Sequence, residues 1–491
     1  MPKIETFLYN EQVKNNYSLY TGKDYMPLEM NIAEQYKPSS STFFSLPYFL
    51  VPFDKDKIEY DKNEEIFFER NLFVTKGDSK YYTFFVHPTT EKIFREWIDG
   101  KYEFISAEKS FFMATPTSSY RSLFVINTRT QANFIVKVSI LGNVARGSRH
   151  IDWCSAQGQY FFSSCTQNAV HNIENFELIK DIAALGLTGE IPISFSKKYE
   201  IMFGPKKINS FGNVIRKVSD IFDGREDSFV CSVASLTSLI GEHGCYLERL
   251  YRESGKSFYG FFGGDFISKI FDKIFELFSN YGISIETHCQ NTLIEISKDW
   301  KFTGKILYRD FDITSFDRAR FPFLFPEMWK KYCSERLDRT SLFSNLSARE
   351  DIGKNFLVHS IDNLVKPCLL CAKKLKIITS NESSIIRDRI YSDFCKRLTK
   401  FLPLYSNLLL ESKSWAFSQN VFKYIDISEI PVKLEKINFF KKDDYERFLV
   451  NSPEFEITDY FSDRNGWILG FANNIFVEFF MPKIQREKDE R

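Results

Sequence analysis

Three short stretches of the chain combine side chains that can bind phosphate and a divalent cation. The first is Pro116–Ser122, which places several hydroxyl groups beside an arginine. The second pairs Lys137 with Arg149, and the third consists of Glu286–Asn291 and the later segment Arg309–Asp312. Hydroxyl and cationic groups donate to phosphate oxygens, whereas Mg²⁺ prefers carboxylate and amide oxygens. Together the stretches offer donors for phosphate and ligands for Mg²⁺.

Each stretch taken alone also has an ordinary structural explanation. A serine-rich turn before an arginine is common in capped loops, and a lysine on a strand often extends into solvent. His288 alone fits a hydrogen-bonded structural histidine. Cys368 and Cys371 form a single CxxC in an apolar, helix-like stretch without a second CxxC or a histidine pair. We interpret them as core residues rather than a zinc or redox site.

Familiar nucleotide-binding and hydrolase motifs are absent from the sequence. Gly255-Lys-Ser257 resembles the end of a P-loop, but the glycine required five positions earlier is Leu250. The chain has no GxGxxG, HExxH or GxSxG motif. These absences exclude the common nucleotide-binding and hydrolase scaffolds.

The composition is that of an ordinary globular protein. The 491 residues include 65 basic and 64 acidic side chains, giving a net charge of +1, and 43% are hydrophobic. These values exclude a disordered or collagen-like chain and argue against a protein that coats nucleic acid. A chain of this length predicts at least two lobes. We expect the 52 phenylalanines to fill the cores.

The sequence predicts a cytoplasmic protein with no membrane partner and no nucleic-acid partner. No segment reaches the roughly 18 uninterrupted apolar residues that span a bilayer. The stretch Met1–Thr6 carries an acid and lacks a basic region before an apolar run, so it is not a secretory signal. Nine scattered cysteines suit reduced thiols.

Apolar periodicity predicts strands in the first half of the chain. Residues 1–80 read as irregular loops. In Phe134–Leu141, alternation places Lys137 on the face opposite Phe134 and Val136. Arg121–Ile126 reads as an adjacent strand.

The second half reads as more helical. Asp265 is expected to cap a helix with an apolar stripe over 267–278, and Gly282 is expected to end it. Two strands follow at 292–297 and 305–310, and helical stripes continue beyond residue 340 to about residue 450.

We therefore expect an α+β protein in three parts. Residues 1–80 form a reduced N-terminal region, 81–225 a strand-rich lobe with the phosphate-binding motif, and 226–491 a helix-rich lobe with the His288 and Asp310 motifs.

The order and spacing of these motifs resemble the NRPS-independent siderophore synthetases of the aerobactin-synthetase type. The matching segments are His87-Pro88, Pro116–Ser122, Val136–Ser139 leading to Arg149, Tyr281–Asn291 and Tyr308–Asp310. The resemblance covers about residues 80–320. Its most specific part is Glu-x-His-x-Gln-Asn followed by Arg-Asp.

The chain departs from the family pattern at several positions. Thr89-Thr90 replaces the usual Trp-Gln after His-Pro, Ser122 replaces a threonine, and Ala145 stands where a threonine is expected. A Gly-His-Pro-x-His-Pro element of the family is missing or shortened within residues 1–80. This difference affects the expected thumb lobe and part of the substrate pocket.

The resemblance implies a cupped-hand fold of thumb, fingers and palm, with ATP between the fingers and the palm. It implies activation of a carboxylate of citrate or a related acid as an acyl-adenylate, with loss of pyrophosphate. An amine or hydroxyl then displaces AMP to give an amide or ester. The implied partners are these small molecules, with ATP and Mg²⁺ as cofactors and a possible homodimer.

The resemblance also implies roles for individual residues. His288, Arg149 and Lys137 would be catalytic, with His288 and Arg149 close to the α-phosphate and the acid. ATP would be bound by Ser118, Ser119, Arg121, Ser122, Lys137, Gln290, Asn291 and Asp310. Mg²⁺ would be bound by Glu286, Asn291 and Asp310.

A second hypothesis stays open at this point. The shortened N-terminal region and Ala145 also fit a non-catalytic relative that binds a nucleotide or a polycarboxylate, or that serves as a partner protein. A third explanation is that the motifs are surface loops of an unrelated fold.

Overall fold

The computed structural model describes residues 3–12, 33–53, 57–98, 100–141, 143–144, 147–148, 150–192, 207–222, 225–237, 245–285, 287–311, 314–316, 325–326, 363–401, 434–438, 460–462, 467–472 and 475–480. Two residues of the predicted site, Arg149 and Glu286, lie outside these ranges.

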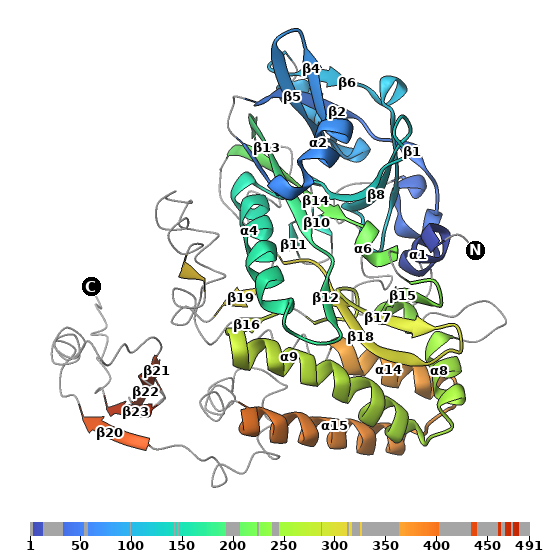
Figure 1. Ribbon diagram of the computed structural model, residues 1–491, viewed down its shortest axis with the longest axis vertical. Helices are drawn as coiled ribbons and strands as arrows, with labels where there is room; N and C mark the ends of the chain where they lie inside the picture. The colour runs from blue at the N-terminus through green and yellow to red at the C-terminus, as the bar shows by residue number, and fades with distance from the viewer. Residues whose placement is uncertain are drawn as a thin grey trace, which may run out of the picture.

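A seven-stranded antiparallel sheet forms the middle of the described structure (Figure 1). In spatial order its strands are β1 (Phe44–Ser45), β7 (Phe112–Pro116), β8 (Ser122–Asn127), β9 (Asn133–Lys137), β14 (Lys207–Lys217), β13 (Asp181–Pro192) and β3 (Ile58–Tyr60). Phe134 and Val136 of β9 enter a core on one face, whereas Ile135 enters a core on the other face. Lys137 shares the side of Ile135, as the alternation predicted.

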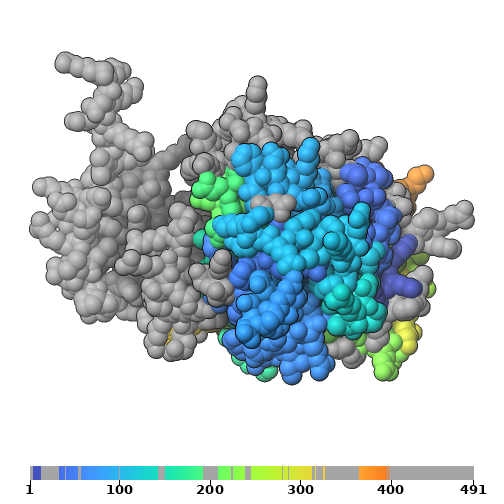
Figure 2. Space-filling model, turned by 90° about the horizontal axis from the view of Figure 1, so that it is seen from above, coloured from blue at the N-terminus to red at the C-terminus, as the bar shows by residue number. Residues whose placement is uncertain are grey.

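A smaller sheet packs on the first face of the seven-stranded sheet. Its strands, in order, are β4 (Phe73–Lys76), β5 (Ser79–Phe85), β2 (Tyr48–Pro52) and β6 (Glu103–Ile105). Helices α2 (Glu65–Asn71) and α3 (Glu91–Ile98) contribute buried side chains to the same core. Figure 2, seen from above, shows blue and cyan residues of this region side by side on the face turned toward the viewer.

These strands correct the expectation of irregular structure over residues 1–80. The part of this segment that the structure describes carries helices and strands that share a phenylalanine-rich core with later strands. The expected boundary near residue 80 falls inside β5. The sequence reasoning failed here because strands such as β1 and β3 are too short to show a clear period of two.

A second four-stranded sheet lies on the other side of the seven-stranded sheet. Its order is β12 (Phe176–Leu178), β18 (Phe302–Tyr308), β17 (Thr292–Ser297) and β15 (Ser228–Ser232). Leu293 and Leu307 face the seven-stranded sheet and share a small apolar core with Phe124 and Ile135. This layer between the two sheets is called the inter-sheet layer below.

Helices cover the outer face of the second sheet (Figure 1). They are α8 (Tyr246–Ser254), the π-helix η9 (Gly260–Ile267), α9 (Ser268–Tyr281), α14 (Asn363–Lys374) and α15 (Ser380–Phe401). Gly282 ends α9 at φ +63°, as predicted. The expected cap at Asp265 is wrong, because η9 continues the helix toward the N-terminus and places Asp265 inside it. Cys368 and Cys371 are buried core residues with free thiols, as interpreted from the sequence.

The remaining elements complete the described structure, and their mixture of helices and sheets confirms the α+β class. The α-helices and short strands are α1 (Lys3–Glu11), α4 (Trp153–Val170), α6 (Ser219–Phe222), α7 (Val233–Leu236), β10 (Asn143–Val144), β11 (Gly147–Ser148), β16 (Ile283–Ser284), β19 (Ser315–Phe316), β20 (Leu434–Asn438), β21 (Tyr460–Ser462), β22 (Trp467–Ala472) and β23 (Ile475–Phe480). The 3₁₀-helices are η1 (Glu34–Tyr36), η2 (Pro38–Ser40), η4 (Lys62–Glu64), η5 (Pro88–Thr90) and η6 (Ala107–Lys109). The strand β20 corrects the expectation of helices up to about residue 450. Within the described ranges, no helix combines the length and the apolar character needed to cross a membrane.

Two glycines let α4 lie directly on the seven-stranded sheet. Gly186 and Gly212 are opposite each other in the β13–β14 ladder. A Cβ at Gly212 would lie 2.5 Å from Ala156 Cβ and 2.6 Å from the Asp152 carbonyl oxygen, and a Cβ at Gly186 would lie 2.7 Å from Trp153. The helix can therefore approach the strands closely only because both side chains are absent.

We expect Gly212→Ala to lower the free energy of unfolding by about 1–3 kcal/mol, because the new methyl group overpacks the contact between α4 and the sheet. Urea denaturation would measure this change. Gly264→Ala is the matched control, because Gly264 is exposed on η9 and a Cβ there meets open space. The control should lose no stability. Equal destabilisation by both variants would contradict the close-approach explanation.

Candidate active site

Lys137 and Asp310 form an ion pair that joins the two sheets. Lys137 ends β9, and Asp310 follows β18 with φ at +74°. The Lys137 Nζ lies 2.7 Å from Asp310 Oδ1, and the two side chains are 2% and 24% exposed. Burial by itself would raise the pKa of Asp310, but Lys137 and Arg216 hold that pKa well below its usual range. The carboxylate is therefore ionised at neutral pH.

Gln159 of α4 connects this pair to a second buried ion pair. Its Oε1 accepts a hydrogen bond from Lys137 Nζ at 3.2 Å, and its Nε2 donates to Asp310 at 2.9 Å and to Asp181 at 3.3 Å. Arg216 Nε donates to Asp181 Oδ1 at 2.7 Å, and both side chains are buried. Burial raises the pKa of Asp181, although Arg216 acts in the opposite direction. A continuous polar network thus runs through the inter-sheet layer.

Arg121 and Ser122 border the same ion pair. Ser122 lies directly opposite Lys137 in the β8–β9 ladder. Arg121 is buried, its carbonyl oxygen accepts a hydrogen bond from Val138 N at 2.8 Å, and its charge acts on Asp310 together with Lys137 and Arg216. Three cations, Lys137, Arg121 and Arg216, thus lie around the two carboxyl groups of Asp310 and Asp181, and this excess of cations suits an anion.

The loop of residues 117–121, between β7 and β8, meets the turn before β17 at Ser118. Gln290 Nε2 donates to the Ser118 carbonyl oxygen at 2.9 Å and to its Oγ at 3.0 Å. Arg309 Nη2 donates to the same Oγ at 3.0 Å and to the Gln290 carbonyl oxygen at 2.8 Å. At the end of the loop, the first residue of β8 closes a turn, because Ser122 N donates to the Ser119 carbonyl oxygen at 3.4 Å.

His288 shapes the turn of residues 288–291. Its Nδ1 accepts a hydrogen bond from Gln290 N at 3.1 Å, and its carbonyl oxygen accepts from Asn291 N at 3.0 Å and Thr292 N at 3.1 Å. With Nδ1 as acceptor, the proton of a neutral ring is carried by Nε2, which is then a donor. The side chains of His288 and Asn291 are both buried.

The structure thus brings most of the predicted residues to one junction. Lys137 and Asp310 pair directly, with Arg121 and Ser122 beside them, and Ser118 contacts Gln290. Arg309 contacts Ser118, and the next residue, Asp310, pairs with Lys137. These two neighbours in sequence therefore connect the two groups of contacts.

The predicted Mg²⁺ ligands are placed only in part. Arg309 N donates to the Asn291 carbonyl oxygen at 3.2 Å, so Asn291 lies next to the segment that carries Asp310. No cluster of three His, Cys, Asp or Glu side chains suited to a metal occurs among the residues that the structure describes. A Mg²⁺ ion at Asp310 would share the carboxylate with Lys137.

Sequence reasoning missed several residues of this junction. They are Gln159, Asp181, Arg216, Arg309 and Glu11, which pairs with Arg309. Of these, only Arg309 had been noted, as part of a motif. Two signals were present in the sequence: an arginine directly before the aspartate of the Arg-Asp motif, and a glutamine beside phenylalanines in the stretch that forms α4. Their partners are far away along the chain, so the pairing itself could not be seen.

His87 of the His-Pro motif packs beneath the loop of residues 117–121. The ring is fully buried, its Nδ1 lies 2.6 Å from Thr89 Oγ1, and it faces the backbone of Tyr120. Burial lowers the pKa of His87 to about 3 and that of His150, which is near Arg121, to about 4. Both imidazoles are therefore neutral at pH 7.

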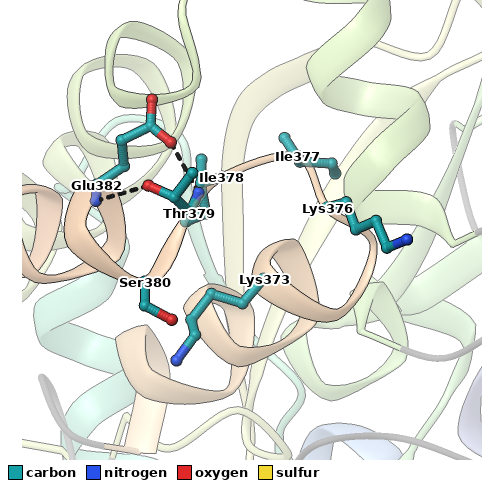
Figure 3. A pocket seen from close by; sticks show the side chains of 7 residues that line it. All are labelled: Lys373, Lys376, Ile377, Ile378, Thr379, Ser380 and Glu382. Atoms are coloured by element: carbon teal, nitrogen blue, oxygen red, sulfur yellow. Dashed lines mark hydrogen bonds between the residues drawn. The ribbon is translucent and has the colours of Figure 1, made fainter.

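Three cavities in the described part of the chain lie away from the junction. One, of about 320 Å³, is lined by the residues that connect α14 to α15 (Figure 3). There Glu382 accepts a hydrogen bond from Thr379 N at 2.7 Å, and Glu382 N donates to Thr379 Oγ1 at 3.2 Å, so the start of α15 is capped by its own side chains. Two others, of about 550 and 570 Å³, adjoin Arg225. None of the three contains a predicted site residue.

Comparison with solved structures identifies the fold. The chain is similar to ATP-bound aerobactin synthetase IucA from Klebsiella pneumoniae, with a TM-score of 0.60 and 15% identity over 86% of this chain and 75% of that chain. It is also similar to petrobactin biosynthesis protein AsbB from Bacillus anthracis, with a TM-score of 0.54 and 14% identity over 79% and 67% of the two chains. Aerobactin synthetase IucC from Klebsiella pneumoniae gives 0.51 and 13% over 80% and 70%.

These similarities show that the chain has the fold of the NRPS-independent siderophore synthetases, which confirms the resemblance drawn from the motifs at the level of the fold. No protein-family model matches the chain, and no curated protein matches it in sequence.

We expect Lys137→Met to lower the free energy of unfolding by about 3–5 kcal/mol, because it removes the ammonium group that pairs with Asp310 and donates to Gln159 in the inter-sheet layer. The double variant Lys137→Met/Asp310→Asn should recover part of that loss, since it removes the unpaired charge. Urea denaturation of the single and double variants measures the free energy of interaction between Lys137 and Asp310.

Lys298→Met is the matched control for this cycle. Lys298 pairs with Asp227 on the surface, where the two side chains are 66% and 85% exposed. The control should leave stability nearly unchanged, because solvent screens an exposed pair. A large loss in the control, or no recovery in the double variant, would contradict the buried pair's role.

The neutral histidines predict acid sensitivity. The pKa of His150 falls from 6.5 to about 4 in the folded protein, so stability is fully present above pH 6.5 and is lost as the pH falls toward 4. Between pH 7.5 and pH 5, the loss from this group should be about 2 kcal/mol. His150→Gln should show a correspondingly smaller loss than the wild type in urea denaturation at the two pH values. His171→Gln, on an exposed histidine, should follow the wild type.

Proposed function

We propose that this chain, which has the fold of the siderophore synthetases, is an ATP-dependent ligase. In this proposal it activates a carboxylate of citrate or a related polycarboxylic acid as an acyl-adenylate. It then condenses that acyl group with an amine or alcohol. The observation that carries the proposal is the junction of the Ser118, Lys137, Gln290 and Asp310 segments between the two sheets.

The first step of the proposed reaction brings two anions together. A carboxylate oxygen of the acid attacks the α-phosphorus of ATP, the bond to the β-phosphate oxygen breaks, and pyrophosphate leaves. Negative charge accumulates on the α-phosphate oxygens in the transition state. Fixed cations in a buried site stabilise that charge, each by about 3 kcal/mol on the scale of oxyanion-hole deletions.

The residues of the junction match these needs in their chemistry. Arg121 supplies a forked cation for phosphate oxygens, and Lys137 supplies a point charge. His288 accepts a hydrogen bond at Nδ1, so its Nε2 can donate to a phosphoryl oxygen, and a histidine does so without adding a permanent charge. In this proposal the ATP phosphates are bound by Ser118, Ser119, Arg121, Ser122 and Lys137. His288 and Arg149 are proposed to lie near the α-phosphate and the acid.

The nucleotide's other contacts are assigned to Gln290, Asn291 and Asp310, and Mg²⁺ is assigned to Glu286, Asn291 and Asp310. Oxygen donors of this kind fit Mg²⁺, which would neutralise phosphate charge when bound.

In the second step the amine or hydroxyl attacks the acyl carbon, the bond to AMP breaks, and an amide or ester forms. A site that excludes water protects the acyl-adenylate from hydrolysis.

Pyrophosphate release with hydroxylamine trapping tests this function over citrate, 2-oxoglutarate and succinate. We expect activity with at least one acid and a loss of at least about 100-fold in His288→Ala and Lys137→Ala. His171→Ala, on an exposed histidine, should keep wild-type activity. Unchanged activity in both site variants would end the residue assignment. Nucleotide binding without turnover on a broad panel of acids and amines would favour the non-catalytic alternative.

A further inference from the structure

The C-terminal end of α1 reaches into the junction from outside the recognised motifs. Glu11 is the last residue of α1, and its Oε2 lies 2.8 Å from Arg309 Nη1 and accepts a hydrogen bond from Ser118 N at 3.3 Å. The two side chains are 0% and 4% exposed. The next residue, Gln12, donates from Nε2 to Thr115 Oγ1 at 2.7 Å and to the Pro116 carbonyl oxygen at 2.8 Å.

The guanidinium group of Arg309 contacts both motif segments as well as Glu11. One guanidinium nitrogen pairs with Glu11, and the other donates to Ser118 Oγ and to the Gln290 carbonyl oxygen. A planar guanidinium can hold several acceptors in a fixed arrangement, whereas a lysine ammonium cannot reproduce that fork. The loop of residues 117–121 and the turn of residues 288–291 are therefore held against each other by one buried cation.

Stability alone does not explain a buried ion pair at this place. Removing two charges from water offsets much of their attraction, so apolar residues of the same size often stabilise a core as well. Phe7 and Leu8 of α1 already pack in the inter-sheet core. The hydrogen bonds of Glu11 and Arg309 to other groups go to backbone or hydroxyl atoms of the two motif segments. The pair thus specifies the geometry of those segments.

We propose that Glu11 and Arg309 are positioning residues that fix the loop of residues 117–121 and the turn of residues 288–291 in the geometry that binds ATP. The N-terminal helix α1 is in this way part of the active-site structure (Figure 1 shows it beside β8 and β15). The role in ATP binding rests on the function proposed above, whereas the ordering of the two segments does not.

Hydrogen exchange of the full chain tests the ordering directly. We expect amides of residues 117–122 and 288–292 to exchange at least about tenfold faster in Arg309→Met, with a smaller effect in Arg309→Lys and the smallest in Glu11→Gln, which keeps an acceptor for Ser118 N. Amides in β15 and α9 should exchange as in the wild type.

Glu295→Gln is the matched control, because Glu295 is another buried carboxylate on the second sheet, 3.2 Å from Arg225 Nε. It should change the thermal midpoint without faster exchange in the two segments. Unchanged exchange in Arg309→Met, or the same acceleration in Glu295→Gln, would overturn the proposal.

Steady-state kinetics give the second readout. In Arg309→Lys we expect the KM for ATP to rise at least about tenfold with a smaller change in kcat, since the loop binds ATP before chemistry occurs. An equal KM for ATP in an active Arg309→Lys enzyme would overturn the binding role. A wild-type chain that neither binds ATP nor releases pyrophosphate would refute the proposed ligase function, and the exchange experiment would still decide the positioning.

Discussion

The ion pair between Lys137 and Asp310 is the interaction on which the arrangement of the two sheets depends. A lysine that is 2% exposed needs a partner, and β9 (Asn133–Lys137) contains no carboxylate. Its ion-pair partner Asp310 comes from the segment after β18, so this ion pair forms when the two sheets are docked. A shift of β9 by one residue would turn Lys137 into the phenylalanine-rich core. The pair therefore specifies both the register of β9 and the docking of the second sheet.

Much of this could be predicted from the sequence where local pattern and tertiary structure agree. The alternation around Phe134 and Val136 correctly placed Lys137 on the opposite face, because a strand has a strict period of two. Gly282 was identified as a helix end because few other residues adopt a positive φ easily. The family resemblance, which assigned both Ser118 and Gln290 to ATP, also implied that their segments would lie close together, and the two residues are in contact.

The failures have a different physical origin. Asp265 looked like a cap because it precedes an apolar stripe, but the glycine- and phenylalanine-rich residues before it form a π-helix whose packing against α15 outweighs their weak helix propensity. Glu11 carries no local signal of its role, and the phenylalanines near Gln159 do not show its partners, because the partners of both residues come from distant strands and turns. Buried polar networks are tertiary features, and a single sequence shows their members without showing their pairing.

The division of the cores suggests why a polar site can persist at this position. The extensive apolar cores lie on the outer faces of the two sheets, where phenylalanines and helices supply most of the buried area. The inter-sheet core is small, and much of the inter-sheet layer is polar. Because buried ion pairs contribute geometry more than net stability, this division lets the outer cores hold the fold while the inter-sheet residues set the site. His87 and His150 stay neutral across the neutral pH range because burial lowers their pKa values, so neither imidazole adds a charge that varies with pH near the site.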